Sequence, residues 1–226
     1  MLFGAGSAYL GKDNRKDKED MVEILTAKGY QYITTAAELA ALSAGPVWGM
    51  FAPGAMAYEM DRAETAQDEP SLADMTAKAI ELLNHNEKGF FLMVEGSKVD
   101  WAAHANDPVG VVSDVLSFDA AVKVALDFAK QDGSTLVMAV TDHNNGGVTL
   151  GDRETDGSYS KDPVSRFIAP LLKAKLTGEG IEYKLNEERS NIKEVMEAWF
   201  GVTDLTEEEI EEIKAAGKGS MNYAVG

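Results

Sequence analysis

Residues able to bind a metal ion gather in two short stretches of this chain. The first places Glu95, Asp100 and His104 at spacings of five and four residues, directly after an apolar run. The second ends another apolar run with the adjacent pair Asp142 and His143. If the first stretch continues as a helix, Asp100 and His104 lie on one face and can chelate one ion. Together the two stretches are typical of a divalent-metal cluster that hydrolyses phosphate esters.

The two apolar runs, residues 89–94 and 135–141, are predicted to be strands buried on both faces, as in a parallel sheet covered by helices. Helical spacing of apolar residues over 111–130 connects them as a right-handed crossover. The metal-binding residues then follow the carboxyl ends of two strands that are neighbours or near-neighbours, at the edge where ligands bind in open α/β sheets. The predicted fold class is therefore α/β: a three-layer sandwich with a mostly parallel sheet, forming part of a domain.

Further elements follow from local sequence signals. Additional strands are expected at residues 1–3, 31–34, 47–52 and 148–150, and additional helices at 18–28, 36–42, 72–83, 190–200 and 206–216. Three of these helices open with a capping box, namely Thr35 with Glu38, Ser71 with Asp74, and Thr206 with Glu209. We expect residues 1–150 to form the α/β core with the metal ligands, and residues 151–226 to form a variable, helical segment of the same domain.

Amino-acid composition limits which metal ligands and which binding partners the chain can have. The chain has no cysteine, so a metal must be held by His, Asp, Glu and water. Its 38 acidic and 21 basic residues give a formal charge of −17, which would repel nucleic acid and anionic membranes. A phosphate ester would need a local positive charge, which bound divalent cations could supply. No stretch reaches the roughly 20 apolar residues of a membrane span, and the opening residues do not have the pattern of a signal peptide.

Several segments of the sequence resemble a known protein family. Residues 89–108, which contain Glu-Gly-Ser-Lys-Val-Asp-Trp-Ala-Ala-His, resemble the metal-binding signature of alkaline phosphatases. Residues 118–129 and the run 135–143 ending in Asp-His continue the match in the family's order. Residues 2–6 and 27–34 are similar to the stretch upstream of that signature, so the resemblance covers roughly the first 150 residues.

The resemblance implies a role for each metal-binding residue. Glu95 would bind one Mg²⁺, Asp100 and His104 would bind one Zn²⁺, and Asp142 and His143 would bind a second Zn²⁺. The substrate would be a phosphate monoester, and the location would be periplasmic or extracellular. Family members are often dimers, so a homodimer is one expectation. No nucleic-acid or membrane partner is expected.

Three further residues, Trp101, Lys98 and His85, are not predicted to be metal ligands. By resemblance, Trp101 lies near the bound phosphate and shapes the substrate pocket; the alternative is a half-buried helix residue without contact to substrate. Lys98 is expected to be exposed. His85 lies at a polar helix end and is expected to be a surface residue.

Several features depart from the family pattern. The nucleophilic serine of the family lies in an Asp-Ser-Ala setting, and this chain contains no Asp-Ser dipeptide. No histidine follows His143, so the last zinc histidine is also missing, and Asn144 and Asn145 stand where the family has an acid followed by a polar residue. We therefore interpret the chain as the carboxyl-side part of an alkaline phosphatase domain, with no catalytic nucleophile and no activity alone.

Two other functions stay open. One is a non-catalytic metal- or phosphate-binding module that kept the fold and lost the chemistry. The other is a different phosphohydrolase of the wider group, such as a cofactor-independent phosphoglycerate mutase, a phosphodiesterase or a sulfatase. Glu95, five residues before Asp100, favours the alkaline phosphatase interpretation, since it supplies the third, magnesium site.

Overall fold

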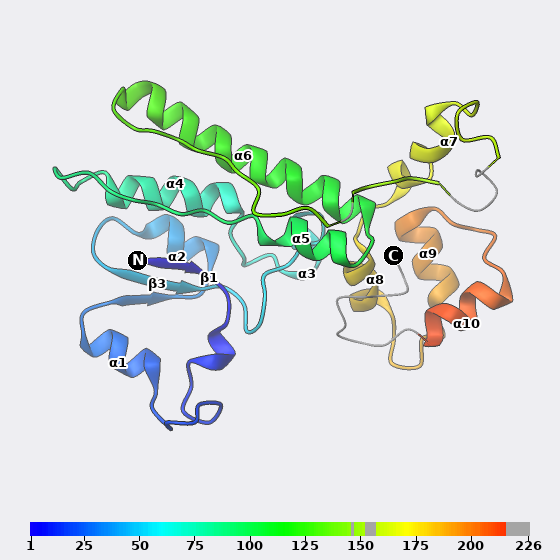
Figure 1. Ribbon diagram of the computed structural model, residues 1–226. Helices are drawn as coiled ribbons and strands as arrows, with labels where there is room; N and C mark the ends of the chain where they lie inside the picture. Colours follow the sequence, from blue (N-terminus) through cyan, green and yellow to red (C-terminus); the bar gives the residue numbers. More distant parts are fainter. Residues whose placement is uncertain (146, 152–156, 216–226) are drawn as a thin grey trace. The chain divides into compact units, whose positions relative to one another are not determined.

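The computed structural model describes residues 1–145, 147–151 and 157–215 (Figure 1). The chain divides into two compact units, each assembled from separate stretches of sequence. The first unit comprises Met1–Ala57, Arg62–Gly96 and Leu116–Ala139, and the second comprises Tyr58–Asp61, Ser97–Val115 and Val140–Gly226. Helix α6 (Pro108–Asp132) therefore begins in the second unit and ends in the first.

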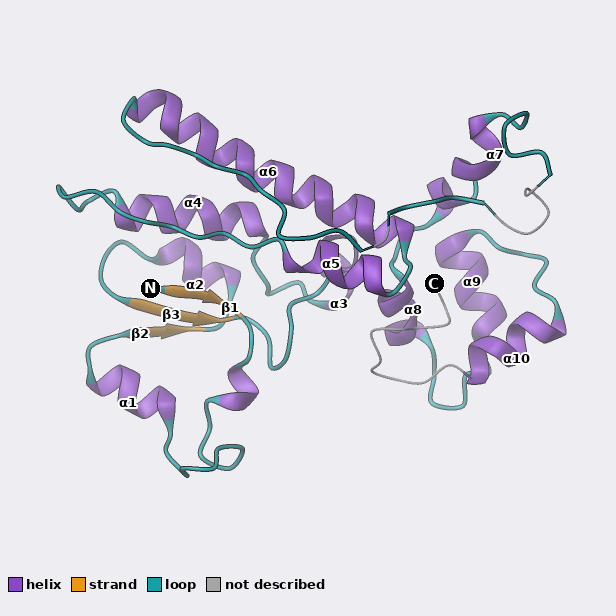
Figure 2. Cartoon of the chain, viewed as in Figure 1, coloured by secondary structure: helices purple, strands orange, loops and turns teal. Residues whose placement is uncertain are grey.

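The first unit is built on a small parallel sheet. Its strands β1 (Leu2–Gly4), β2 (Gln31–Ile33) and β3 (Val47–Met50) lie in the order β1-β3-β2. Figure 2 shows helix α1 (Met21–Ala27) on one side of this sheet and helices α2 (Ala36–Ala41) and α4 (Leu72–Leu83) on the other. This layering confirms the predicted α/β class with parallel strands, because each crossover returns through a helix that covers a face.

Local signals explain why these helices begin where they do. The capping boxes at Thr35 with Glu38 and at Ser71 with Asp74 are both formed, and each satisfies backbone N–H groups at the start of its helix. The helices bury apolar side chains against the sheet. The resulting core consists of Ile33, Leu39, Leu42, Val47 and Phe51.

Two of the strongest strand predictions are wrong. Within the described residues, neither 89–94 nor 135–141 joins a sheet, and 148–150 forms no strand either. Residues 90–94 and 135–138 alternate between partly covered and exposed, with Phe91 89% exposed and Leu136 81% exposed, whereas residues 139–141 are all exposed. An apolar run shows that a segment can be buried on both faces, but a strand also needs a neighbouring backbone to pair with. The described residues do not provide one.

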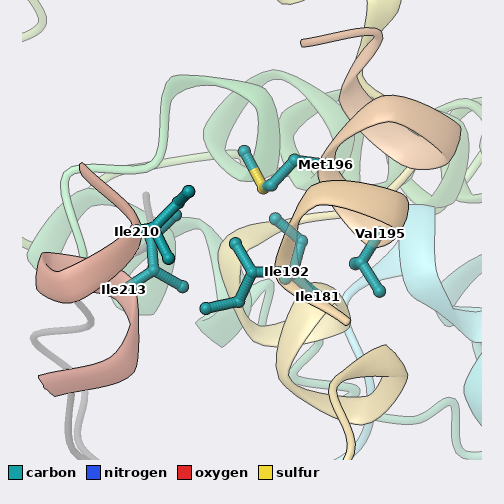
Figure 3. Packing of buried hydrophobic residues seen from close by; sticks show 6 residues of the cluster. All are labelled: Ile181, Ile192, Val195, Met196, Ile210 and Ile213. Atoms are coloured by element: carbon teal, nitrogen blue, oxygen red, sulfur yellow. The ribbon is translucent and has the colours of Figure 1, made fainter. Parts of the chain in front are cut away.

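The second unit is largely helical. Helices α8 (Gly178–Lys184), α9 (Ile192–Phe200) and α10 (Glu207–Ala215) enclose the apolar cluster shown in Figure 3, formed by Ile181, Ile192, Val195, Met196, Ile210 and Ile213. Helix α9 ends at Gly201, whose φ of 64° is the left-handed value that favours glycine. The helices predicted at 190–200 and 206–216 are thus confirmed, although α9 begins at Ile192 and α10 at Glu207. Residue 216 lies outside the described residues.

The remaining elements are short. They are helix α3 (Glu59–Thr65), helix α5 (Ser97–His104), helix α7 (Val164–Ile168) and the 3-10 helices η1 (Ser7–Tyr9) and η3 (Leu171–Lys173). Helices α3, α7 and α8 were not predicted, since each is too short to produce a clear apolar period. Among the described residues no helix is both long enough and apolar enough to cross a membrane.

Candidate metal centre

Helix α5 presents the first pair of predicted ligands. Asp100 and His104 are one turn apart on this helix, and the His104 Nε2 atom lies 3.6 Å from the Asp100 Oδ1 atom. The helix ends at His104, and two residues later Asn106 takes a positive φ of 54°. Asp107 then accepts hydrogen bonds from the N–H groups of Val109 (3.0 Å) and Gly110 (2.9 Å) and so caps the start of α6. The predicted helical spacing of this pair is therefore confirmed.

One member of the second pair of predicted ligands, His143, reaches the same carboxylate. The His143 Nε2 atom lies 3.8 Å from the Asp100 Oδ1 atom and 3.6 Å from the Asp142 Oδ2 atom. All these residues belong to the second unit, so residues about forty positions apart in sequence converge on Asp100. Asp142 is 91% exposed, and both imidazoles are about half exposed, so the cluster is open to solvent.

A residue that the sequence did not single out as an anchor holds this arrangement together. The side-chain amide of Asn145 donates to Asp100 Oδ1 at 2.8 Å and to the Asp100 backbone carbonyl at 3.2 Å. These two bonds tie the segment carrying Asp142 and His143 to helix α5. In the sequence, Asn145 stands where the family has a polar residue, which indicates a polar contact near the site. The spacing alone does not identify Asp100 as its hydrogen-bond partner.

The separations within this cluster can be compared with those of a zinc site. Two ligands about 2.0–2.1 Å from a tetrahedral zinc lie roughly 3.3–3.4 Å from each other. The pairs Asp100–His104 and Asp142–His143 are each separated by 3.6 Å, slightly more than that value. Across residues 1–145, 147–151 and 157–215, no three His, Cys, Asp or Glu side chains form a group that could hold a metal ion. Each pair therefore offers two donors with suitable chemistry, and a complete site needs further ligands.

Glu95 belongs to the first unit, where it is exposed directly after the extended segment 89–94. Its assignment to magnesium stays a prediction. His85 lies in a turn after helix α4 and is exposed, which confirms the expectation of a surface residue.

Lys98 is not exposed, contrary to the prediction. Its ammonium group lies 4.0 Å from the ring centroid of Tyr58 and 4.5 Å from that of Trp101, and it approaches a Glu179 carboxylate oxygen at 3.9 Å. These contacts leave only 12% of the side chain exposed. A cation lying over two aromatic rings is stabilised there, which explains why Lys98 folds back against α5. Trp101 is partly buried, and its contact with a bound phosphate stays a prediction.

Comparison with known proteins assigns the chain to a family. The sequence model described as alkaline phosphatase matches residues 3–199. Alkaline phosphatase 4 of Bacillus subtilis is 42% identical over 222 residues, which are 98% of this chain and 44% of that protein. The chain belongs to the alkaline phosphatase family.

Other relatives support the same assignment. The repressible alkaline phosphatase of Saccharomyces cerevisiae is 31% identical over 91% of this chain and 40% of its own length. The crystal structure of Thermus thermophilus alkaline phosphatase superimposes with a TM-score of 0.82 and 31% identity, over 94% of this chain and 44% of that one. The chain therefore spans less than half the length of these relatives.

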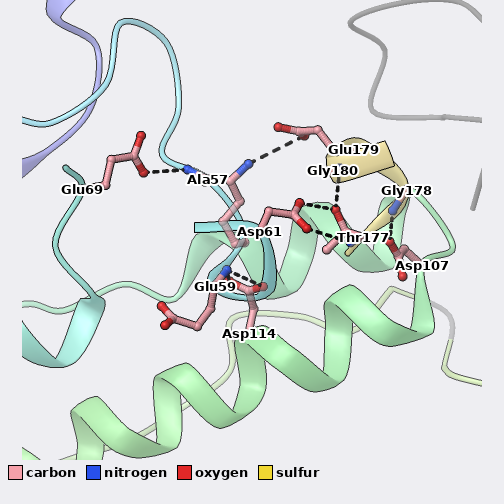
Figure 4. A network of polar contacts seen from close by, with 11 residues as sticks. Ala57, Glu59, Asp61, Glu69, Asp107, Asp114, Thr177, Gly178, Glu179 and Gly180 are labelled. Carbon is pink, nitrogen blue, oxygen red and sulfur yellow. Dashed lines mark hydrogen bonds and ion pairs between the residues drawn. The ribbon is translucent and has the colours of Figure 1, made fainter. Parts of the chain in front are cut away.

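Around the Asp100 helix, this member of the alkaline phosphatase family carries a network of buried carboxylates (Figure 4). Asp61 accepts hydrogen bonds from the Thr177 N–H at 2.8 Å and from the Thr177 hydroxyl at 2.5 Å. Asp107, the α6 cap, also accepts from the Gly178 N–H at 2.8 Å. A Cβ atom at Gly180 would come within 2.3 Å of an Asp61 carboxylate oxygen, so this helix start requires glycine to accommodate the buried acid.

Asp114 is the most perturbed member of this network. Its carboxylate is buried on α6 and accepts from the Glu59 N–H at 3.4 Å. Burial raises the pKa of Asp114 to about 7, although the Glu59 N–H and the positive charge of Lys98 oppose this shift. Burial likewise raises the pKa of Tyr58, and the carboxylates of Glu179 and Asp107 raise it further.

We predict that Asp114→Asn stabilises the protein most at alkaline pH. In the unfolded chain this carboxyl ionises near its ordinary pKa of about 3.9, whereas in the folded chain it stays protonated up to about 7. The folded state therefore holds an extra proton between these values, and stability falls as pH rises through this window. Two pKa units correspond to about 3 kcal/mol, so the gain in unfolding free energy should be about 3 kcal/mol larger at pH 8 than at pH 5.

Urea unfolding at both pH values measures this difference. Asp119→Asn, an exposed residue of the same helix, is the matched control and should show no comparable pH dependence. Equal gains for Asp114→Asn at the two pH values would contradict the raised pKa.

Proposed function

We propose that this chain supplies part of the metal centre of an alkaline-phosphatase-type phosphomonoesterase. The observation that carries the proposal is the convergence of His104, His143 and Asn145 on the carboxylate of Asp100. Family membership and the names of the relatives support phosphomonoester hydrolysis at the level of the family. Because the chain spans less than half the length of these relatives, the activity of a whole enzyme is part of the proposal.

In this proposal Asp100 and His104 hold one Zn²⁺, Asp142 and His143 hold a second, and Glu95 holds Mg²⁺. Bound metals of this kind polarise a phosphoryl oxygen and lower the pKa of a bound water. The donor set suits these ions, because zinc accepts mixed imidazole and carboxylate ligands and magnesium prefers oxygen.

In this proposal Asn145 also orients a metal ligand, Asp100. Asn145 donates to the same carboxylate oxygen that faces both imidazoles, so it limits the rotation of Asp100. Such partners of a metal ligand orient it and adjust its affinity. Divalent cations would also locally offset the formal charge of −17, which otherwise repels an anionic substrate.

The chain alone should bind zinc through these pairs. We expect calorimetric titration to detect zinc uptake, and His104→Ala to weaken it at least roughly tenfold because one of two ligands on that ion is lost. His85→Ala removes an exposed histidine outside the cluster and is the control that should leave the affinity unchanged. Equal weakening by both substitutions, or no uptake above buffer, would contradict the assignment.

Asn145→Ala should weaken zinc binding by roughly 10–100-fold, since removing a partner of a metal ligand has effects of this size. The neighbouring Asn144 is exposed, and Asn144→Ala is the matched control. Circular dichroism checks that both variants keep their helix content. An Asn145→Ala variant with the affinity of Asn144→Ala would remove Asn145 from the centre.

Hydrolysis by the chain alone should be absent. The sequence has no Asp-Ser dipeptide and no histidine after His143, so neither the family's serine setting nor its last zinc histidine is present. We expect the 226-residue chain, with zinc and magnesium added, to hydrolyse p-nitrophenyl phosphate no faster than buffer. Turnover that disappears in Asp100→Ala would overturn this expectation.

The same departures favour one alternative, a metal-binding module without catalysis. Zinc uptake without any gain of activity when the rest of an alkaline phosphatase is supplied would favour the module. A location outside the cytoplasm, a phosphate monoester substrate and a homodimer remain predictions from the family resemblance.

A further inference from the structure

Helix α5, which carries Asp100 and His104, has little buried apolar surface to hold it in place. Of its eight residues only Ala102 is buried, with 1% of its surface exposed. A helix of two turns is unstable by itself and normally depends on a packed apolar face. Other contacts are therefore needed to fix the position of the two predicted ligands.

Lys98 makes such contacts in the first turn of α5. Its ammonium group lies 4.0 Å from the ring centroid of Tyr58, directly before helix α3, and 3.9 Å from a carboxylate oxygen of Glu179 on helix α8. Tyr58 is only 5% exposed, so its ring is fixed in the interior of the second unit. Cation–π contacts and ion pairs are stronger where the charge has lost most of its water, as it has at Lys98. These contacts join α5 to two other segments of the unit.

Trp101 connects this contact to the ligands. Lys98, Trp101 and His104 follow one another along α5 at intervals of three residues, and side chains with this spacing are neighbours on a helix. The ammonium group of Lys98 lies 4.5 Å from the Trp101 ring centroid. Lys98 therefore stacks on a residue that is next to Asp100 in sequence and one turn before His104.

We propose that Lys98 is a positioning residue of the metal centre. It anchors the first turn of α5 to Tyr58 and Glu179, and it thereby holds Asp100 and His104 in the direction that zinc binding requires. The inference rests on the proposed function and adds to it a residue that binds no metal itself.

The charge of Lys98 allows anchoring to be distinguished from simple electrostatics. A lysine two residues from a zinc ligand repels the cation, so removal of its charge would by itself tighten zinc binding. Loss of the anchor acts in the opposite direction, because ligands whose supporting contacts are lost bind a metal more weakly. Weaker zinc binding after removal of the charge therefore identifies anchoring.

The test compares Lys98→Met with Lys184→Met. Lys184 also lies over an indole, 4.5 Å from the ring centroid of Trp199, so its substitution removes the same charge and the same kind of contact from helices α8 and α9. In calorimetric titrations we expect Lys98→Met to bind zinc roughly tenfold more weakly than the unaltered chain, and Lys184→Met to bind it equally well. Lys98→Arg keeps the charge and stacks on aromatic rings, so it should restore most of the affinity.

Hydrogen exchange measures the anchoring without zinc. The Ala105 amide donates to the Trp101 carbonyl at 3.0 Å, and its exchange in the free chain should be at least roughly tenfold faster in Lys98→Met than in Lys184→Met. Tyr58→Leu removes the ring but no charge, and it should change both readouts in the same direction as Lys98→Met. Circular dichroism checks that the variants keep their helix content.

Several outcomes would overturn the proposal. They are a zinc affinity that is unchanged or higher in Lys98→Met, equal exchange of the Ala105 amide in the two lysine variants, and an equal loss of zinc affinity in Lys184→Met. No zinc uptake by the unaltered chain would overturn the proposed function, and the exchange measurement would still decide whether Lys98 anchors α5.

Discussion

The carboxylate of Asp100 is the point on which the candidate centre depends. It lies on a helix of two turns, and it faces His104 of the same helix and His143 of a distant segment. The two histidines face the same carboxylate only while helix α5 and the segment carrying His143 keep their positions. The amide of Asn145 holds the distant segment, and the Asp107 cap fixes where the helix that follows begins. The Asn145 contact therefore keeps His143 near the carboxylate oxygen that His104 also faces.

Charge explains much of the surrounding structure. An acidic chain that gathers carboxylates in one region must satisfy those that are buried. Asp61 and Asp107 are satisfied by backbone N–H groups at the start of helix α8, and the glycine at position 180 leaves room for Asp61. Asp114 accepts only long hydrogen bonds of 3.4 Å, and burial raises its pKa, as burial also raises the pKa of Asp61. Buried acids of this kind lower stability at neutral pH, and the helix N-termini that they cap recover part of that loss.

Local features of this fold could be predicted from the sequence. The capping boxes, the Gly201 helix end and the helical spacing of Asp100 and His104 each depend on residues within one or two turns, so the sequence contains the full signal. Features that depend on distant partners could not be predicted. The runs at 89–94 and 135–141 have the composition of interior strands, but their pairing depends on backbone that the described residues do not supply. The burial of Lys98 could not be predicted either, because the rings of Tyr58 and Trp101 that cover it come together only in the folded chain.

A metal centre organised around Asp100 can be tested on the histidines directly, because the chain has only three of them. A ¹⁵N–¹H NMR spectrum of the imidazole groups should resolve all three, and zinc can be added stepwise. The signals of His104 and His143 should shift on zinc addition, while that of exposed His85 should stay in place. Shifts of His85 equal to those of His104 and His143, or no shift of His104 and His143, would contradict a metal centre organised around Asp100.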